Sequence, residues 1–120
     1  MLTVPEALRA AAGAVDPLEV TLAGWLVVAR GIAYLADAQL DPAANLEPAV
    51  LISDQRVANG LAASGLPIMV GSIVEFELQA EVTGLLVSTP LPQFPGAIVR
   101  AERLVVQDER RKRIIALRET

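Results

Sequence analysis

Residues 73–87 constrain the fold of this chain more than any other stretch of its sequence. From Val74 to Val82 every second residue is apolar, and the residues between them are Glu or Gln. Alternation with a period of two is typical of a β-strand that has one buried and one solvated face. A helix would scatter the same residues around its whole circumference. The pattern therefore predicts a long strand that the rest of the chain pairs with or covers.

Residues 18–36 predict a β-hairpin. A strand is expected over 18–28, with Gly24 in its middle, where a glycine often marks a bend or bulge. Arg30-Gly31 is a plausible tight turn that leads into a second strand over 32–36. Opposing the residues that flank this turn sets the register, and the register places three large side chains on one face: Trp25, Val27 and Tyr34.

Two short helices are predicted. Thr3 and Glu6 have the spacing of a capping box, which indicates a helix over 4–12. Asp54, or the serine before it, can cap a second helix that is expected to end near Ser64. The stripe of this helix that is expected to face inward consists of Val57, Leu61 and Ala62.

The remaining segments are two proline-containing loops and several apolar stretches. Residues 37–48 and 88–96 predict loops, since proline cannot sit within a sheet. The run 49–52 predicts a short buried strand. Residues 97–106 predict a further strand, although their apolar positions also fit a helical spacing. After a charged turn or helix start at 108–113, the last apolar patch is either a returning strand or a terminal helix turn.

The order of these elements supports a resemblance to a known fold. It is carried by two strands with a central glycine and by two further segments: Val20-x-Leu22-x-Gly24, Val82-Thr83-Gly84, Tyr34-Leu35-Ala36-Asp37, and Ile98 to Val106. Together they resemble an OB-fold, the five-stranded Greek-key β-barrel of oligonucleotide- and oligosaccharide-binding domains, with a helix between its third and fourth strands. Another small β-barrel or sandwich, or a mixed α+β arrangement, would also fit.

We therefore expect a mainly β chain that forms a single domain over residues 1–120. Its parts are an N-terminal helical segment at 1–15, an OB-like barrel at 18–107 and a charged C-terminal segment at 108–120. A chain of this length can bury one core.

The composition argues against catalysis. The chain has no cysteine and no histidine, so thiolate chemistry, the usual general base and the commonest transition-metal ligand are absent. We expect no enzyme activity, no catalytic residue, no cofactor and no metal. The longest apolar runs are far shorter than the ~20 residues that a membrane-spanning helix needs, and no basic segment opens a secretory signal. A cytoplasmic location without membrane contact is expected.

Charge divides the chain unevenly. Residues 1–99 carry three basic side chains against ten acidic ones, whereas residues 100–120 carry seven against four. Most of the domain would repel a polyanion, and the end of the chain could attract one.

These observations predict a non-enzymatic module that binds a protein partner or a second copy of itself, in a subunit role or as an inhibitor of the immunity-protein type. The residues expected at that surface are Trp25, Val27, Tyr34, Glu75, Glu77 and Glu81. In the competing structural interpretation, Trp25 and Tyr34 form a second core layer under the N-terminal helix, and the glutamates form a solubilising face.

Binding of single-stranded nucleic acid is the alternative function, because OB-folds combine aromatic platforms with a basic groove. The residues that would serve it are Trp25, Tyr34, Arg100, Arg103, Arg110, Arg111, Lys112 and Arg113. The basic run also fits a solvated turn or a salt-bridged face, since acidic residues adjoin it and no aromatics are interleaved.

Overall fold

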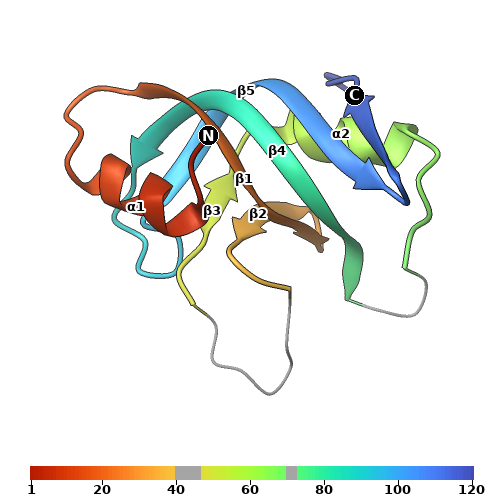
Figure 1. The fold of residues 1–120 in the computed structure, drawn as a ribbon, viewed down its shortest axis with the longest axis horizontal. Helices are drawn as coiled ribbons and strands as arrows, with labels where there is room; N and C mark the ends of the chain where they lie inside the picture. Colours follow the sequence, from red (N-terminus) through yellow and green to blue (C-terminus); the bar gives the residue numbers. More distant parts are fainter. Residues whose placement is uncertain (40–46, 70–72) are drawn as a thin grey trace.

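The computed structural model describes residues 1–39, 47–69 and 73–120. Within them the chain is mainly β, as expected, with two helices and six strands (Figure 1). In chain order these are α1 (Val4–Ala12), β1 (Leu18–Ala29), β2 (Ile32–Ala36), β3 (Val50–Ile52), α2 (Gln55–Ala63), β4 (Val74–Ser88), β5 (Gly96–Asp108) and β6 (Arg111–Ile115). The loop predicted over 37–48 lies largely outside the described residues.

The strands form one sheet in the order β3-β2-β1-β4-β5-β6, in which neighbours are antiparallel. In addition, β3 pairs with β5 in parallel, from Val50 opposite Gly96 to Ile52 opposite Ile98. Residues 97–106 are therefore a strand and not a helix. The last apolar patch begins at the end of β6, a returning strand that pairs with β5 and has no second strand neighbour among the described residues.

The first hairpin has the predicted register. Arg30 and Gly31 both have positive φ, 51° and 79°, which is the backbone of the tight turns that suit the twist of a two-stranded ribbon. Ala29 consequently lies opposite Ile32, and Val27 lies opposite Tyr34. The predicted face of each hairpin side chain is therefore confirmed.

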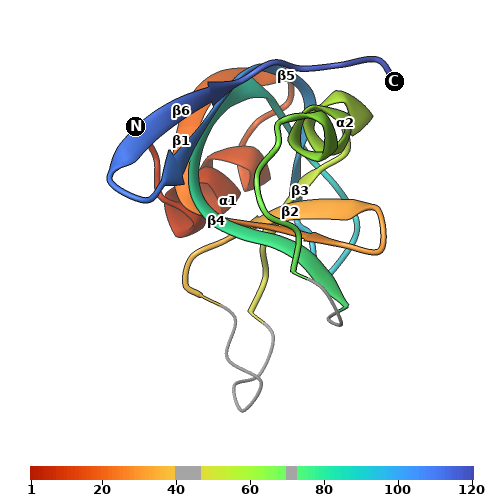
Figure 2. The same cartoon turned by 90° about the vertical axis from the view of Figure 1, so that its right-hand side faces the viewer.

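One parity of side chains from the strands meets both helices in a single core. The long strand β4 contributes Phe76, Ala80, Val82 and Leu86. The helices add Val4, Ala7 and Ala11 from α1, and Val57 and Leu61 from α2. Figures 1 and 2 show α1 and α2 apart from each other, so each covers a different part of this core.

One residue of the predicted helix stripe was wrong. Ala62 is exposed, and the third buried residue of α2, beside Val57 and Leu61, is Gly60. A Cβ on Gly60 would collide with the carbonyl oxygen of Ala116. The absence of a side chain at Gly60 therefore lets the C-terminal segment pass directly over the helix.

Gly24 in β1 and Gly84 in β4 lie where the backbone of another strand comes very close. A Cβ on Gly24 would lie 2.7 Å from the carbonyl oxygen of Ala36, and one on Gly84 would collide with the carbonyl oxygen of Arg100. Gly84 also adjoins a register shift between β4 and β5. Only glycine permits these approaches without displacement of the neighbouring strand.

Asp54 and Arg56 at the start of α2 bind the backbone of Ala101 in β5. The Asp54 carboxylate accepts a hydrogen bond from the backbone amide of Ala101 at 2.8 Å. Arg56 Nη2 donates to the backbone carbonyl oxygen of Ala101, also at 2.8 Å. Ala101 lies between the part of β5 that pairs with β3 and the part that pairs with β6. The two side chains therefore supply the hydrogen bonds that a neighbouring strand would otherwise make.

This arrangement perturbs the Asp54 carboxylate, whose side chain is 9% exposed. The side-chain hydrogen bond from Arg56 is the largest cause, and backbone hydrogen bonds from Ala101 and Arg56 add to it. Together they lower the pKa of Asp54 from 3.8 to about 2, against the opposing effect of burial.

We expect Gly24→Val and Gly84→Val each to lower the free energy of unfolding by more than ~1 kcal/mol, because the new side chain meets strand backbone. Denaturant unfolding measures the effect. Gly13→Ala is the matched control, since a Cβ there meets nothing nearer than 4.0 Å. Unchanged stability in both valine variants would contradict the close approach of the strands.

We expect Asp54→Asn to lower the free energy of unfolding by roughly 1–2 kcal/mol at neutral pH. Because the folded pKa of Asp54 is depressed from 3.8 to about 2, its stabilisation is fully present above the unfolded value and is lost as pH falls through the folded one. The difference between wild type and variant should therefore shrink from pH 4 to pH 2. Urea unfolding across this range tests it, with Glu102→Gln as the exposed carboxylate control. A difference that does not depend on pH would be contrary evidence.

Candidate functional site

The candidate site lies on the outer face of the sheet, whose side chains point away from the core. Cross-strand pairing defines its rows, because residues directly opposite each other share a face. Tyr34, Val27 and Glu77 form one row across β2, β1 and β4. Trp25 and Gln79 form the next row. All six residues expected at a partner surface therefore share this face by their rows or by their parity on β4, with Glu75 at one end and Glu81 one row beyond Trp25 and Gln79.

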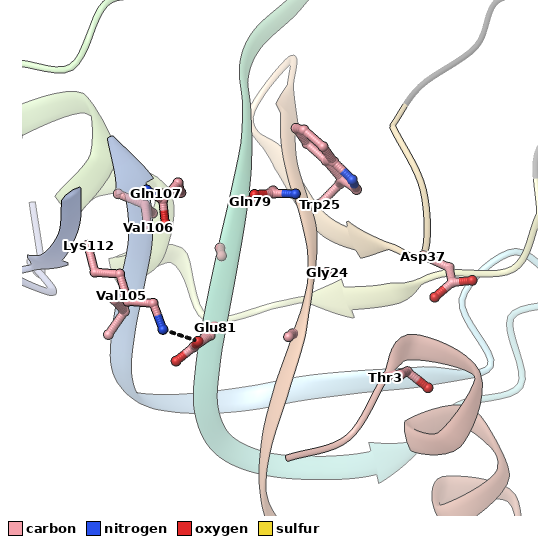
Figure 3. A pocket seen from close by; sticks show the side chains of 12 residues that line it. Thr3, Gly24, Trp25, Asp37, Gln79, Glu81, Val105, Val106, Gln107 and Lys112 are labelled. Atoms are coloured by element: carbon pink, nitrogen blue, oxygen red, sulfur yellow. Dashed lines mark hydrogen bonds and ion pairs between the residues drawn. The ribbon is translucent and has the colours of Figure 1, made fainter. Parts of the chain in front are cut away.

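An open groove of about 380 Å³ runs along this outer face. We call it the Trp25 groove. It is lined by Thr3, Ala23, Gly24, Trp25, Asp37, Gln79, Ala80, Glu81, Val105, Val106, Gln107 and Lys112. Figure 3 shows Trp25 beside Gln79, with Asp37 and Glu81 on different sides of Gly24. The groove thus combines an aromatic ring, two amides and two carboxylates with a floor of small residues.

Trp25 does not form a core layer under the N-terminal helix, so that interpretation was wrong. Helix α1 packs on the opposite parity of β1: Val4 lies beside Gly24 and belongs to the core with Leu22 and Leu26. Trp25 is half-buried and lies outside that core. Its ring is therefore accessible from the groove.

Tyr34 and Val27 have different surroundings from Trp25. Tyr34 packs against Phe94 of the loop between β4 and β5, with ring centroids 5.6 Å apart. Burial, and then the charge of Glu77, raise the pKa of the Tyr34 phenol. Val27 is fully buried despite lying on the outer face. Of the three hairpin side chains, Trp25 is the one that lines the groove.

The basic run at the C-terminal end is divided between two faces. Lys112 Nζ forms an ion pair with Glu81 Oε1 at 3.0 Å on the outer face. Arg113 instead donates to the carbonyl oxygen of Ser64 at the end of α2, a position where a cation also complements the helix dipole. Arg113 Nη1 also lies 3.9 Å from Asp108 Oδ2. Lys112 and Arg113 are therefore already engaged within the chain.

The other arginines of the nucleic-acid alternative are exposed but dispersed. Arg100 pairs across strands with Leu85, and Arg103 with Thr83, in the second half of β4. By parity Arg103 shares the outer face, one row beyond Glu81. Arg110 and Arg111 lie at the turn and start of β6. None of these four lines the Trp25 groove.

The sequence pattern missed several groove residues. Gln79 was predicted on the solvated face without a role, and Asp37, Gln107 and Thr3 were not assigned to a site. They come from separate segments, so only the folded arrangement brings them together. Phe94, the partner of Tyr34, was likewise not assigned to a site.

In the described part of the chain, no group of three or more acidic, histidine or cysteine side chains could hold a metal ion, and no helix there has the length and apolarity to cross a membrane. No protein-family model, curated protein or solved structure matches the chain.

The surroundings of Trp25 can be tested by fluorescence, because it is the only tryptophan in the sequence. We expect caesium ions to quench its emission more effectively than iodide at constant ionic strength, relative to free N-acetyltryptophanamide, because Asp37 and Glu81 line the same groove. Asp37→Asn should reduce the caesium effect. Equal quenching by both ions would show that the groove is not acidic.

Proposed function

We propose that this chain folds as an OB-like closed barrel. The support is the circuit of pairings that runs from β1 through β2, β3, β5 and β4 back to β1. In chain order, helix α2 lies between the third and fourth strands, β3 and β4, as in the OB-fold plan. In this proposal, α1 and β6 are additions to the barrel.

We propose further that the chain is a non-enzymatic binding module whose outer face engages a protein with a basic surface. The observation that carries this is the Trp25 groove: an accessible tryptophan at the acidic half of the sheet. Half-buried aromatic side chains in concave sites are frequent anchors of protein interfaces. Glu75, Glu77 and Glu81 on β4, with Asp37 at the groove, would attract and orient a basic partner.

Charge distribution favours this partner over the alternatives. A single-stranded nucleic acid that stacked on Trp25 would bring phosphates to these carboxylates, whereas none of the four exposed arginines lines the groove. Two copies of the chain meeting through this face would oppose like charges, which favours a different, basic protein. An inhibitor of such a protein fits this arrangement. A cytoplasmic location stays a prediction.

We expect Trp25→Ala to weaken binding of the authentic partner about 30-fold, the ~2 kcal/mol of an aromatic anchor. The partner is captured from cells that express the chain, identified and purified, and its dissociation constant is measured by calorimetry. Leu91→Ala is the matched control, because Leu91 is an exposed apolar residue outside the groove.

Two results would overturn this function. One is a partner whose affinity is the same for wild type and Trp25→Ala. The other is tight binding of a single-stranded oligonucleotide that weakens steeply between two salt concentrations, which is the signature of phosphate contacts.

A further inference from the structure

The ion pair between Lys112 and Glu81 crosses a whole strand. Lys112 lies in β6 opposite Gln107, and Glu81 lies in β4 opposite Val105. Since β5 lies between β4 and β6, the lysine side chain must extend over β5 to reach the carboxylate. Figure 3 shows it running beside Val105 toward Glu81. The aliphatic part of Lys112 therefore forms one wall of the Trp25 groove.

This ion pair is easily separated. The Lys112 side chain is 67% exposed, whereas that of Glu81 is 29% exposed. Exposed pairs of this kind contribute little net stability, because water solvates the cation well and a long side chain must be held in place. Glu81 is less exposed to water, so water replaces the carboxylate at the ammonium group more readily than it replaces the cation at Glu81.

The remaining groove residues suit a second cation. Asp37 and Glu81 provide two carboxylates against the single ammonium group of Lys112. Gln79 and Gln107 add amide oxygens that accept hydrogen bonds. A tryptophan ring is the best aromatic partner for a cation that approaches its face. A planar guanidinium group can stack on the ring while its in-plane N–H groups donate hydrogen bonds, whereas an ammonium group has no plane with which to stack.

We propose that the Trp25 groove receives an arginine side chain of the basic partner, and that Lys112 occupies Glu81 until this arginine displaces it. The choice of a protein as the source of the arginine rests on the proposed function. The binding of a guanidinium group does not rest on it, so the guanidinium site and the proposed function can be tested separately. The methylene groups of this arginine would then cover Val105 in place of the methylene groups of Lys112.

The test uses N-acetyl-arginine amide as the probe, with N-acetyl-citrulline amide as its uncharged analogue of the same shape. Binding is followed at constant ionic strength by Trp25 emission and by the NMR signals of the Trp25 indole N–H and the Gln79 and Gln107 side-chain amides. We expect a saturable change with the arginine probe, a weaker one with N-acetyl-lysine amide and none with the citrulline analogue.

Variants distinguish displacement of Lys112 from general attraction of positive charge. Lys112→Gln should tighten probe binding about threefold, because the resident cation is gone, and Glu81→Gln should weaken it about threefold or more. Arg110→Gln removes the same charge as Lys112→Gln from the neighbouring turn, and Glu102→Gln removes the same charge as Glu81→Gln from outside the groove. Both controls should leave the affinity nearly unchanged.

Several outcomes would overturn the inference. Equal binding of the citrulline analogue would show that shape and not charge is recognised. Equal effects of Lys112→Gln and Arg110→Gln would show that Lys112 does not occupy the site. If no arginine probe binds while the authentic partner still depends on Trp25, this inference fails and the proposed function stands. If the probe binds but the affinity of the partner does not depend on Trp25, the proposed function fails and the guanidinium site stands.

Discussion

The parallel pairing of β3 with β5 is the contact on which the rest of this fold depends. It spans three residues in each strand, yet it joins the two ends of the run β3-β2-β1-β4-β5. Without it, the backbone groups along β3 and along the start of β5 would be exposed strand edges, a common route to aggregation. The core residues of one parity would also lose the enclosure that keeps water from them.

Several features sustain this pairing. The approach of β5 to β4 requires a position without a side chain at Gly84. Further along β5, where pairing with β3 has ended, the Asp54 and Arg56 side chains hold the backbone of Ala101. Since Asp54 also caps α2, the helix that follows β3 is tied to β5 by the same residue. The connection between β3 and α2 thereby reinforces the contact between the two strands.

Enclosing one face of the sheet leaves the other face outside the core. Every second residue of β4 serves the core, and the residues between them are available for the outer surface. Gly24 separates these roles in β1: its missing side chain admits Val4 of α1 on the core face, while the adjacent Trp25 lines the groove on the other. The N-terminal helix therefore shapes the interior without covering the aromatic ring.

Local signals in the sequence predicted most of the secondary structure. The capping box of Thr3 and Glu6 is present, with both reciprocal hydrogen bonds, and the Arg30-Gly31 turn set the hairpin register. What could not be predicted depends on contacts between distant segments. The role of Gly60 depends on the return of the C-terminal segment, and the partner of Tyr34 comes from a loop sixty positions later. The groove was only partly predictable for the same reason: Trp25 and Glu81 follow from strand parity, but Lys112 reaches Glu81 across an intervening strand.

The position of β6 at the rim of the sheet has a consequence for solubility at high concentration. This strand carries Arg111, Lys112 and Arg113 in succession, with side chains on alternate faces. A second molecule that tried to continue the sheet there, strand against strand, would set cation against cation. Such an edge discourages ribbon-like stacking of identical molecules through β6.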